Sequence, residues 1–166
     1  MSWSRTLIVA LLAAGGAGGC GFHLRGDVSY AFPTIFVNSP TPQPIVTELR
    51  RSLDGSSSTK LVDGPKDAVV TLDIANVVDD KSVLSLSSGG RVSEYQLTKR
   101  VSFSLRDKEG RDWIPAGEIV IRRSYTFNES EVLAREHEEI RTLREMQTDA
   151  VQQIMRRLQA ARKPIA

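Results

Sequence analysis

The residue types that most often carry enzymatic chemistry are few in this chain, and none stands in a catalytic spacing. Its two histidines, His23 and His137, lack a metal-ligand spacing such as H-E-x-x-H. The run His137-Glu138-Glu139 could do acid–base work, although such a run is more typical of an exposed helical face. Asp79 and Asp80 could form a carboxylate pair, but a solvated turn is the better interpretation. We therefore expect a protein that is not an enzyme and that has no metal site and no cofactor.

Basic residues offer binding chemistry instead. Arginine presents a planar fork that makes two hydrogen bonds to one phosphate group, so it suits an anionic lipid head group. The candidates are Arg91, Lys99, Arg100, Arg122, Arg123 and Arg135. Strand alternation predicts Arg100 and Arg122 on the face away from the helices, with Lys99 among the apolar set. The alternative is that each of them is a solvated surface charge.

The first 19 residues have the pattern of an export signal. Arg5 is followed by an apolar run over residues 7–14, which is far shorter than the roughly 20 residues of a membrane-spanning helix. The small residues Ala17, Gly18 and Gly19 stand directly before Cys20. A charged start, a short apolar core and a small-residue cleavage site predict a signal peptide over residues 1–19.

Cys20 is the only cysteine of the chain, so it has no partner for a disulfide within the chain. The segment resembles a bacterial lipobox, in which the thiol is acylated and becomes the mature N-terminus. We expect Cys20 to be the lipidation site, and two or more acyl chains anchor a protein stably. Gly21 in place of an aspartate favours the outer membrane. The alternative is an ordinary secretory signal with an incidental cysteine.

The size and charge of the mature chain indicate one globular domain. Removing residues 1–19 leaves 147 residues, and the full chain has ordinary hydrophobic and charged fractions of 40% and 25%. The formal net charge of +2 implies no strong field for nucleic acid. We expect a tether over residues 20–31, one domain over residues 32–163 and a tail over residues 164–166.

Hydrophobic periodicity predicts the elements that position these residues. Strands are expected at residues 32–38, 68–78, 94–106 and 117–127, and helices at residues 44–54 and from Asn128 to Lys163-Pro164. Residues 56–60 are expected to be mobile, and residues 79–91 to form a long flexible hairpin end. Asn128 and Glu131 fit a capping box at the start of the last helix.

The same periodicity predicts which side chains face the core. In the first long strand these are Val70, Leu72, Ile74, Asn76 and Val78. In the second they are Tyr95, Leu97, Val101, Phe103 and Leu105. In the last helix they are Ile140, Leu143, Met146, Ala150, Val151, Ile154 and Leu158. The order β-α-β-β-β-α predicts an α/β protein, an α+β sandwich in which two helices pack on one face of a sheet.

Three segments resemble one known family. Cys20-Gly21-Phe22-His23-Leu24-Arg25-Gly26 is similar to the mature start of the LPS-assembly lipoproteins, the LptE or RlpB family. Glu94-Tyr95-Gln96-Leu97 resembles the E-Y-Q segment of that family on a central strand. Arg123-Ser124-Tyr125-Thr126-Phe127 resembles its aromatic strand before the last helix. The likeness covers nearly the whole mature chain in the same order.

The resemblance implies a four-stranded, mostly antiparallel mixed sheet and a role in lipopolysaccharide (LPS) transport. It implies an outer-membrane lipoprotein, lipid-anchored on the periplasmic side, that forms a plug-and-barrel complex with the β-barrel LptD. Such a protein assists assembly of the barrel and binds LPS on its way to the outer leaflet. By position, the LPS contacts correspond to Arg91 and Arg135, while Ser88 stands where some members carry the basic residue.

Two other functions remain open from the residues alone. The first is a lipoprotein accessory component of an ABC-type lipid transport system, which would fractionate with an inner-membrane ATPase. The second is a periplasmic hydrolase, which would require activity that depends on His137.

Overall fold

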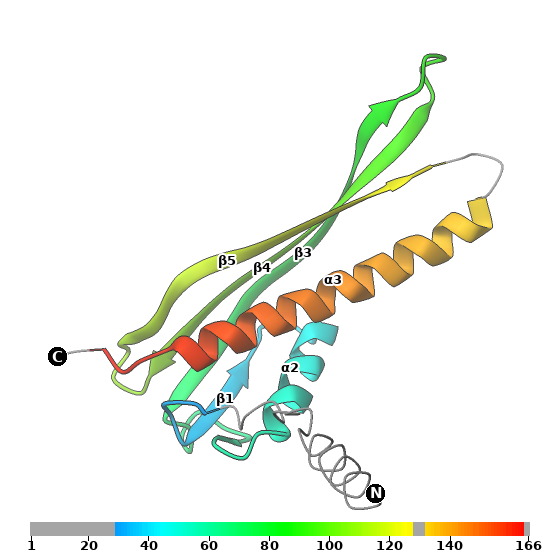
Figure 1. Cartoon of the computed structure of the whole chain (residues 1–166). Helices are drawn as coiled ribbons and strands as arrows, with labels where there is room; N and C mark the ends of the chain where they lie inside the picture. Colours follow the sequence, from blue (N-terminus) through cyan, green and yellow to red (C-terminus); the bar gives the residue numbers. More distant parts are fainter. Residues whose placement is uncertain (1–28, 128–131, 165–166) are drawn as a thin grey trace, which may run out of the picture.

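The computed structural model describes residues 29–127 and 132–164, and the side chains of the second range from residue 136 onward. These ranges hold one mixed sheet and two helices, in an α+β arrangement (Figure 1). The predicted fold class is therefore confirmed. Cys20, Asn128 and Glu131 lie outside the described residues, as does the first family motif.

The sheet has five strands in the order β2-β1-β3-β4-β5, rather than the four that were predicted. Their bounds are β1 Thr34–Asn38, β2 Lys60–Leu61, β3 Val70–Leu86, β4 Val92–Asp107 and β5 Asp112–Thr126. β1 runs parallel to β2 and β3, and the other pairs are antiparallel. The additional strand is β2, whose backbone bonds to β1 through Lys60 N to Pro33 O at 2.9 Å. It starts at the end of the segment that was predicted to be mobile.

The two helices carry the apolar stripes that their sequence periods predict, except that Ile140, predicted to face the core, is exposed. α2 (Pro44–Asp54) begins at a proline, which lacks the N–H that a first helical turn leaves unbonded. α3 (Val132–Ala160) ends before Lys163-Pro164, where the sequence predicted its end. Fully buried side chains come from both helices: Ile45, Leu49, Leu53, Met146, Ala150, Ile154 and Leu158. The α2 residue Glu48 accepts hydrogen bonds from Gln147 and Thr148 of α3, at 2.7 and 2.9 Å.

The β3–β4 hairpin has longer strands than the sequence suggested. The ladder continues to Leu86 on β3 and starts again at Val92 on β4, so only residues 87–91 form the turn. Gly90 adopts a φ of 74°, a region that favours glycine. Residues 79–91 do form a hairpin end, but β3 continues through this segment to Leu86 instead of ending at Val78, and most of the segment pairs with β4.

A β-bulge at Ala75 changes which side chains of β3 face the core. The register shifts between Ile74 and Asn76, so the alternation of inward and outward side chains slips by one residue. Val77 consequently packs against the core, while Asn76 and Val78, both predicted to face it, are exposed. A second irregularity lies opposite Phe103 and Leu105, where β5 accommodates Pro115. β5 therefore begins at Asp112 rather than at Gly117.

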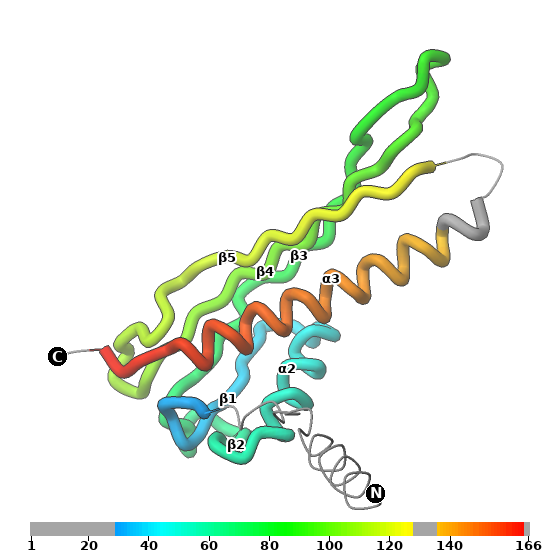
Figure 2. Tube along the Cα trace, in the orientation of Figure 1, coloured from blue at the N-terminus to red at the C-terminus, as the bar shows by residue number. Residues whose placement is uncertain are grey.

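The core occupies one end of an elongated molecule, and the hairpin tip projects from the other end (Figure 2). On β3 the last fully buried side chain before the tip is Ile74, and on β4 the first one after it is Leu97. On α3, the first buried side chain among those described is Met146. The tip and the first part of α3 thus lie beyond the main core, toward the same end of the molecule (Figure 1).

Candidate functional site at the hairpin end of the molecule

The two predicted LPS-contacting positions lie toward the hairpin end. Arg91 is exposed at the end of the β3–β4 turn, where its N–H bonds to Ser87 Oγ at 3.3 Å. Arg135 lies in the first part of α3, and its side chain is not among those described. The fold therefore brings these segments, 44 residues apart in sequence, to one end of the molecule (Figure 1).

Three aliphatic side chains near the hairpin tip are exposed to solvent. Val83, Leu84 and Leu86 keep 51%, 48% and 60% of their surface accessible. The register shifts between Val83 and Ser85, so Leu84 lies in a β-bulge of the hairpin. Sequence reasoning missed this feature, although aliphatic residues inside a segment predicted to be a flexible hairpin end were its signal.

A polar and aromatic cluster, which we call the tyrosine–lysine cluster, joins the hairpin to α3. It consists of Lys81 on β3, Tyr95 on β4, Tyr125 on β5 and Glu139 on α3. Lys81 Nζ lies 4.4 Å from the Tyr95 ring centroid and forms an ion pair with Glu139. The Tyr125 hydroxyl donates a hydrogen bond of 2.7 Å to the same Glu139 oxygen. The cluster thus connects all three long strands with α3.

The charges of this cluster support one another. Burial alone would raise the pKa of Glu139, but hydrogen bonds from Lys81 and Tyr125 outweigh it and lower that pKa. Burial alone would lower the pKa of Lys81, and its bonds to Glu139 and Tyr125 raise it instead. Burial raises the pKa of Tyr125, which keeps its hydroxyl a donor. The cluster is therefore a neutral ion pair with a protonated phenol at ordinary pH.

A buried charge lies on the helix-facing side of the sheet. Lys99 points with the apolar side chains of β4, as predicted, and is only 4% exposed. Its ammonium group bonds to Asp79, with a shortest distance of 2.6 Å. The prediction that Asp79 and Asp80 lie in a solvated turn is wrong, because both belong to β3.

The candidate arginines Arg100, Arg122 and Arg123 divide between the two faces of the sheet as alternation predicts. Arg100 pairs with Val120 and Arg122 pairs with Thr98, on the face away from the helices. Arg123 points the other way and forms an ion pair of 2.6 Å with Asp149 of α3. The basic residues therefore do not form one patch.

The residues considered for catalysis are not brought together. His137 and Glu138 are exposed on α3, and Glu139 belongs to the tyrosine–lysine cluster. Within residues 29–127 and 132–164, no group of three or more histidine, cysteine or acidic side chains could hold a metal ion. In the same part of the chain, no helix is long and apolar enough to span a membrane.

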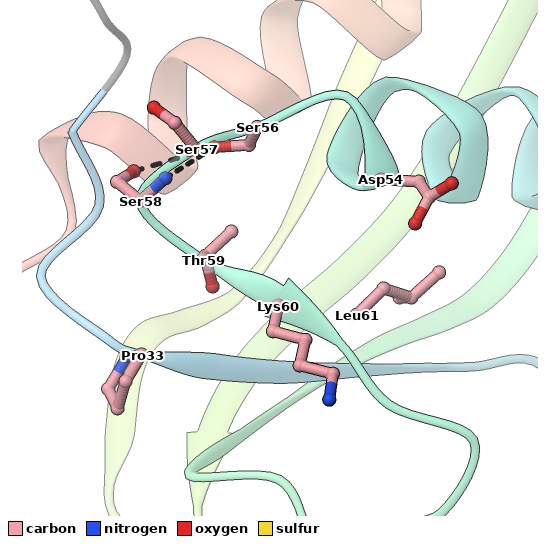
Figure 3. A pocket seen from close by; sticks show the side chains of 8 residues that line it. All are labelled: Pro33, Asp54, Ser56, Ser57, Ser58, Thr59, Lys60 and Leu61. Atoms are coloured by element: carbon pink, nitrogen blue, oxygen red, sulfur yellow. Dashed lines mark hydrogen bonds between the residues drawn. The ribbon is translucent and has the colours of Figure 1, made fainter.

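A polar cavity of about 270 Å³ lies beside the start of β1, in the core end of the molecule. Figure 3 shows its lining, which includes Ser56, Ser57, Ser58 and Thr59. Ser58 Oγ accepts a bond of 3.1 Å from Tyr30 N, and Ser58 N donates to Ser56 Oγ at 3.4 Å. These hydroxyls serve the backbone where the chain enters the domain, which is a structural role.

Comparisons with known proteins place this fold in one family. The family model described as LptE, lipopolysaccharide-assembly, matches residues 32–158. The LPS-assembly lipoprotein LptE of Photorhabdus laumondii is 30% identical over 143 residues, covering 84% of this chain and 77% of the relative. The protein of the same name from Pectobacterium atrosepticum is 28% identical with the same coverage.

Solved structures agree with these relatives. The solution structure of uncharacterized lipoprotein B from Nitrosomonas europaea has a TM-score of 0.72 and 32% identity, covering 82% of this chain and 88% of that one. The crystal structure of rare lipoprotein B from Shewanella oneidensis has a TM-score of 0.63 and 27% identity, covering 74% and 91%. Members of the family are non-enzymatic assembly factors, in agreement with the prediction. The match over residues 32–158 shows that this chain belongs to the lipopolysaccharide-assembly family LptE.

Proposed function

We propose that this protein is an outer-membrane lipoprotein that forms a plug-and-barrel complex with the β-barrel LptD and binds LPS for delivery to the outer leaflet. The observation that carries the proposal is the family match over residues 32–158, together with relatives named LPS-assembly lipoprotein. The three family motifs in the sequence support the same assignment.

The surface of the domain suits the inside of a barrel. The lumen of an outer-membrane barrel is polar, so a plug needs a polar exterior around its own core. The face of the sheet away from the helices carries Arg100 and Arg122, and the solvent-facing side of α3 carries exposed charges such as Arg144. The polar groups on these surfaces can replace hydrogen bonds to water by hydrogen bonds to the polar barrel wall with little loss of free energy.

The hairpin end suits an amphipathic anion. LPS combines phosphate groups with acyl chains, and the tip combines Arg91 with three exposed aliphatic side chains. Arg135 is the second cationic position in our proposal. Guanidinium groups bind phosphate through paired hydrogen bonds, and the aliphatic groups supply apolar contact area.

The N-terminus completes the proposal. Removal of residues 1–19 would leave Cys20 as an acylated first residue, and residues 20–31 would connect the lipid to the folded domain. Mass spectrometry of the mature protein tests this step. An unmodified Cys20 or a retained signal peptide would contradict it.

Complex formation is tested by recovering the full-length protein from native outer membranes in mild detergent. We expect a stable one-to-one complex with a β-barrel protein, identified by mass spectrometry. Recovery as a lone monomer would contradict the proposal, and recovery with an inner-membrane ATPase would favour the transporter accessory instead.

The LPS site is tested by reversing its charges. We expect Arg91→Glu with Arg135→Glu to reduce the LPS that co-purifies with the complex by roughly tenfold, which corresponds to the loss of about 1.4 kcal/mol. The matched control is Arg51→Glu with Lys60→Glu, which reverses two exposed charges in the core end. Both double variants should assemble with the barrel. LPS retention at the wild-type level in the Arg91 and Arg135 double variant would show that these residues are bystanders.

A further inference from the structure

Two of the family motifs meet in the structure. Tyr95, from the E-Y-Q segment, and Tyr125, from the aromatic strand, are direct cross-strand partners with ring centroids 5.8 Å apart. Phe127 packs edge-on against Tyr95 at 5.3 Å. Their place on the sheet is beside the early part of α3, to which Tyr125 bonds.

Lys81 enters this aromatic group from the neighbouring strand. Its ammonium group lies 4.4 Å from the centroid of Tyr95 and 5.7 Å from that of Tyr125, within the range of cation–π attraction. Glu139 receives both the ammonium group and the Tyr125 hydroxyl. One carboxylate of α3 is thus bound by β3 and β5 together.

This part of α3 needs such a bond because it reaches beyond the main core. Met146 is its first buried side chain among those described, Leu143 is only partly buried, and Ile140 is 43% exposed. A helix end without apolar packing frays, because most helical stability in proteins comes from tertiary contact. The bonds of Glu139 to two strands supply a tertiary contact at this point.

We propose that Lys81, Tyr95, Tyr125 and Glu139 form a positioning clamp that fixes the first part of α3 against the β3–β4 hairpin. Arg135 precedes Glu139 by one helical turn, and Arg91 lies at the tip of the hairpin that carries Lys81 and Tyr95. The clamp therefore sets the spacing of the two cationic positions. The clamp itself follows from the geometry of these four residues, whereas its role in spacing Arg91 and Arg135 rests on the proposed LPS site.

The chain offers a matched control in a second ion pair between the sheet and α3. Arg123 on β5 bonds to Asp149 at 2.6 Å, in the part of the helix where Met146 and Ala150 are buried. Apolar packing already holds the helix there. Loss of this ion pair should leave the first part of α3 unchanged.

The clamp is tested by hydrogen exchange on the full-length protein in detergent. We expect Glu139→Gln and Lys81→Met to speed exchange of the amides of residues 136–142 by roughly tenfold, the factor that corresponds to about 1.4 kcal/mol. Lys81→Arg keeps a cation over Tyr95 and should exchange much like wild type. Asp149→Asn should not change residues 136–142. Wild-type exchange in Glu139→Gln and Lys81→Met would overturn the clamp.

The milder variant Tyr125→Phe separates loss of the clamp from general destabilisation of α3. If Glu139→Gln also speeds exchange across residues 146–158, the whole helix has loosened, and Tyr125→Phe then decides. This variant removes one hydroxyl and keeps the ring, so faster exchange confined to residues 136–142 would support the clamp. Unchanged exchange there would overturn it.

The link to LPS is tested on the complex with the barrel. We expect Glu139→Gln to lower the amount of co-purified LPS about threefold, and Asp149→Asn to leave it unchanged. Faster exchange with wild-type LPS retention would overturn the spacing role. If the Arg91 and Arg135 double variant retains LPS, the proposed LPS site is wrong. The clamp is then still tested by hydrogen exchange of residues 136–142, which does not depend on LPS.

Discussion

A buried ammonium group, that of Lys99, lies in the middle of β4, and a single carboxylate, that of Asp79, compensates its charge. Lys99 is 4% exposed, whereas its partner Asp79 keeps 44% of its side chain accessible. Removing one member of a buried pair leaves the other charge without compensation, while replacing the charge by an apolar group of similar volume costs little. The two residues should therefore respond very differently to substitution.

We predict that Asp79→Ala lowers the free energy of unfolding by about 2 kcal/mol, less than for a fully buried pair because water reaches Asp79. Lys99→Met should change it by less than about 1 kcal/mol, or increase it. Asp80→Ala is the matched control, since alternation turns Asp80 to the opposite face. Urea denaturation of the three variants measures these differences. Equal losses for Asp79→Ala and Asp80→Ala would contradict the assignment.

The tyrosine–lysine cluster gives a residue-scale prediction about pH. The pKa of Glu139 is lowered in the folded protein, so its contribution to stability is present above its ordinary pKa of 4.5 and is lost as pH falls through the lowered value. The raised pKa of Lys81 means that its contribution persists below pH 10.5 and is lost only above it.

We therefore expect wild type to exceed Glu139→Gln in stability at pH 7, with the difference shrinking as pH falls below about 4.5. Denaturant unfolding of both proteins between pH 3 and pH 8 measures it. A difference that stays constant down to pH 3 would show that the ionised carboxylate contributes nothing.

At the scale of elements, the two long hairpins are closed by tight turns. Gly110 ends the turn between β4 and β5 with a φ of 79°, and a Cβ there would meet no atom within 4 Å. The cost of a side chain at Gly110 is therefore a backbone cost alone. Gly64 also has open space but no positive φ, which makes it a matched control.

We predict that Gly110→Ala lowers the free energy of unfolding by about 1 kcal/mol, because a non-glycine residue is strained at this φ. Gly64→Ala should be neutral or stabilising by a few tenths of a kcal/mol. Thermal unfolding of the two variants beside wild type provides the measurement. Equal effects at both positions would contradict the backbone explanation.

The elements that the sequence predicted well are those whose period is intact. Ile45, Leu49 and Leu53 repeat at helical spacing, and α2 follows them closely. Prediction failed where the register between two strands changes, and where a strand forms only because a distant segment of the chain pairs with it. The bulge at Ala75 leaves no local sign in the alternation, and β2 exists because β1 accepts its backbone.

The candidate site shows the same division. Arg91 was predicted from its position before the E-Y-Q segment, and it lies at the hairpin tip. The tyrosine–lysine cluster was not found, because Lys81 and Glu139 are 58 residues apart and meet only when α3 crosses the sheet. Neither residue stands in a spacing that indicates contact. Distant polar pairs of this kind require the topology before they can be recognised.

At the scale of the whole molecule, stability is distributed unevenly along the long axis. The buried side chains of β1, α2 and the second half of α3 gather at one end, whereas Val83, Leu84 and Leu86 are exposed at the other. Local opening costs least where few apolar contacts must be broken. In the isolated protein, the outer half of the hairpin should therefore exchange its amides much faster than the core.

In the proposed complex this gradient should change. A partner that covers the tip would bury its aliphatic groups, at roughly 25 cal/mol for each square ångström removed from water. We predict that amides of residues 82–94 become at least about tenfold more protected in the complex with the barrel than in the isolated protein, because protection follows the free energy of local opening. Those of α2, already in the core, should change little. Hydrogen exchange on both preparations measures this, and equal protection of the hairpin in the two would show that its tip stays in solvent.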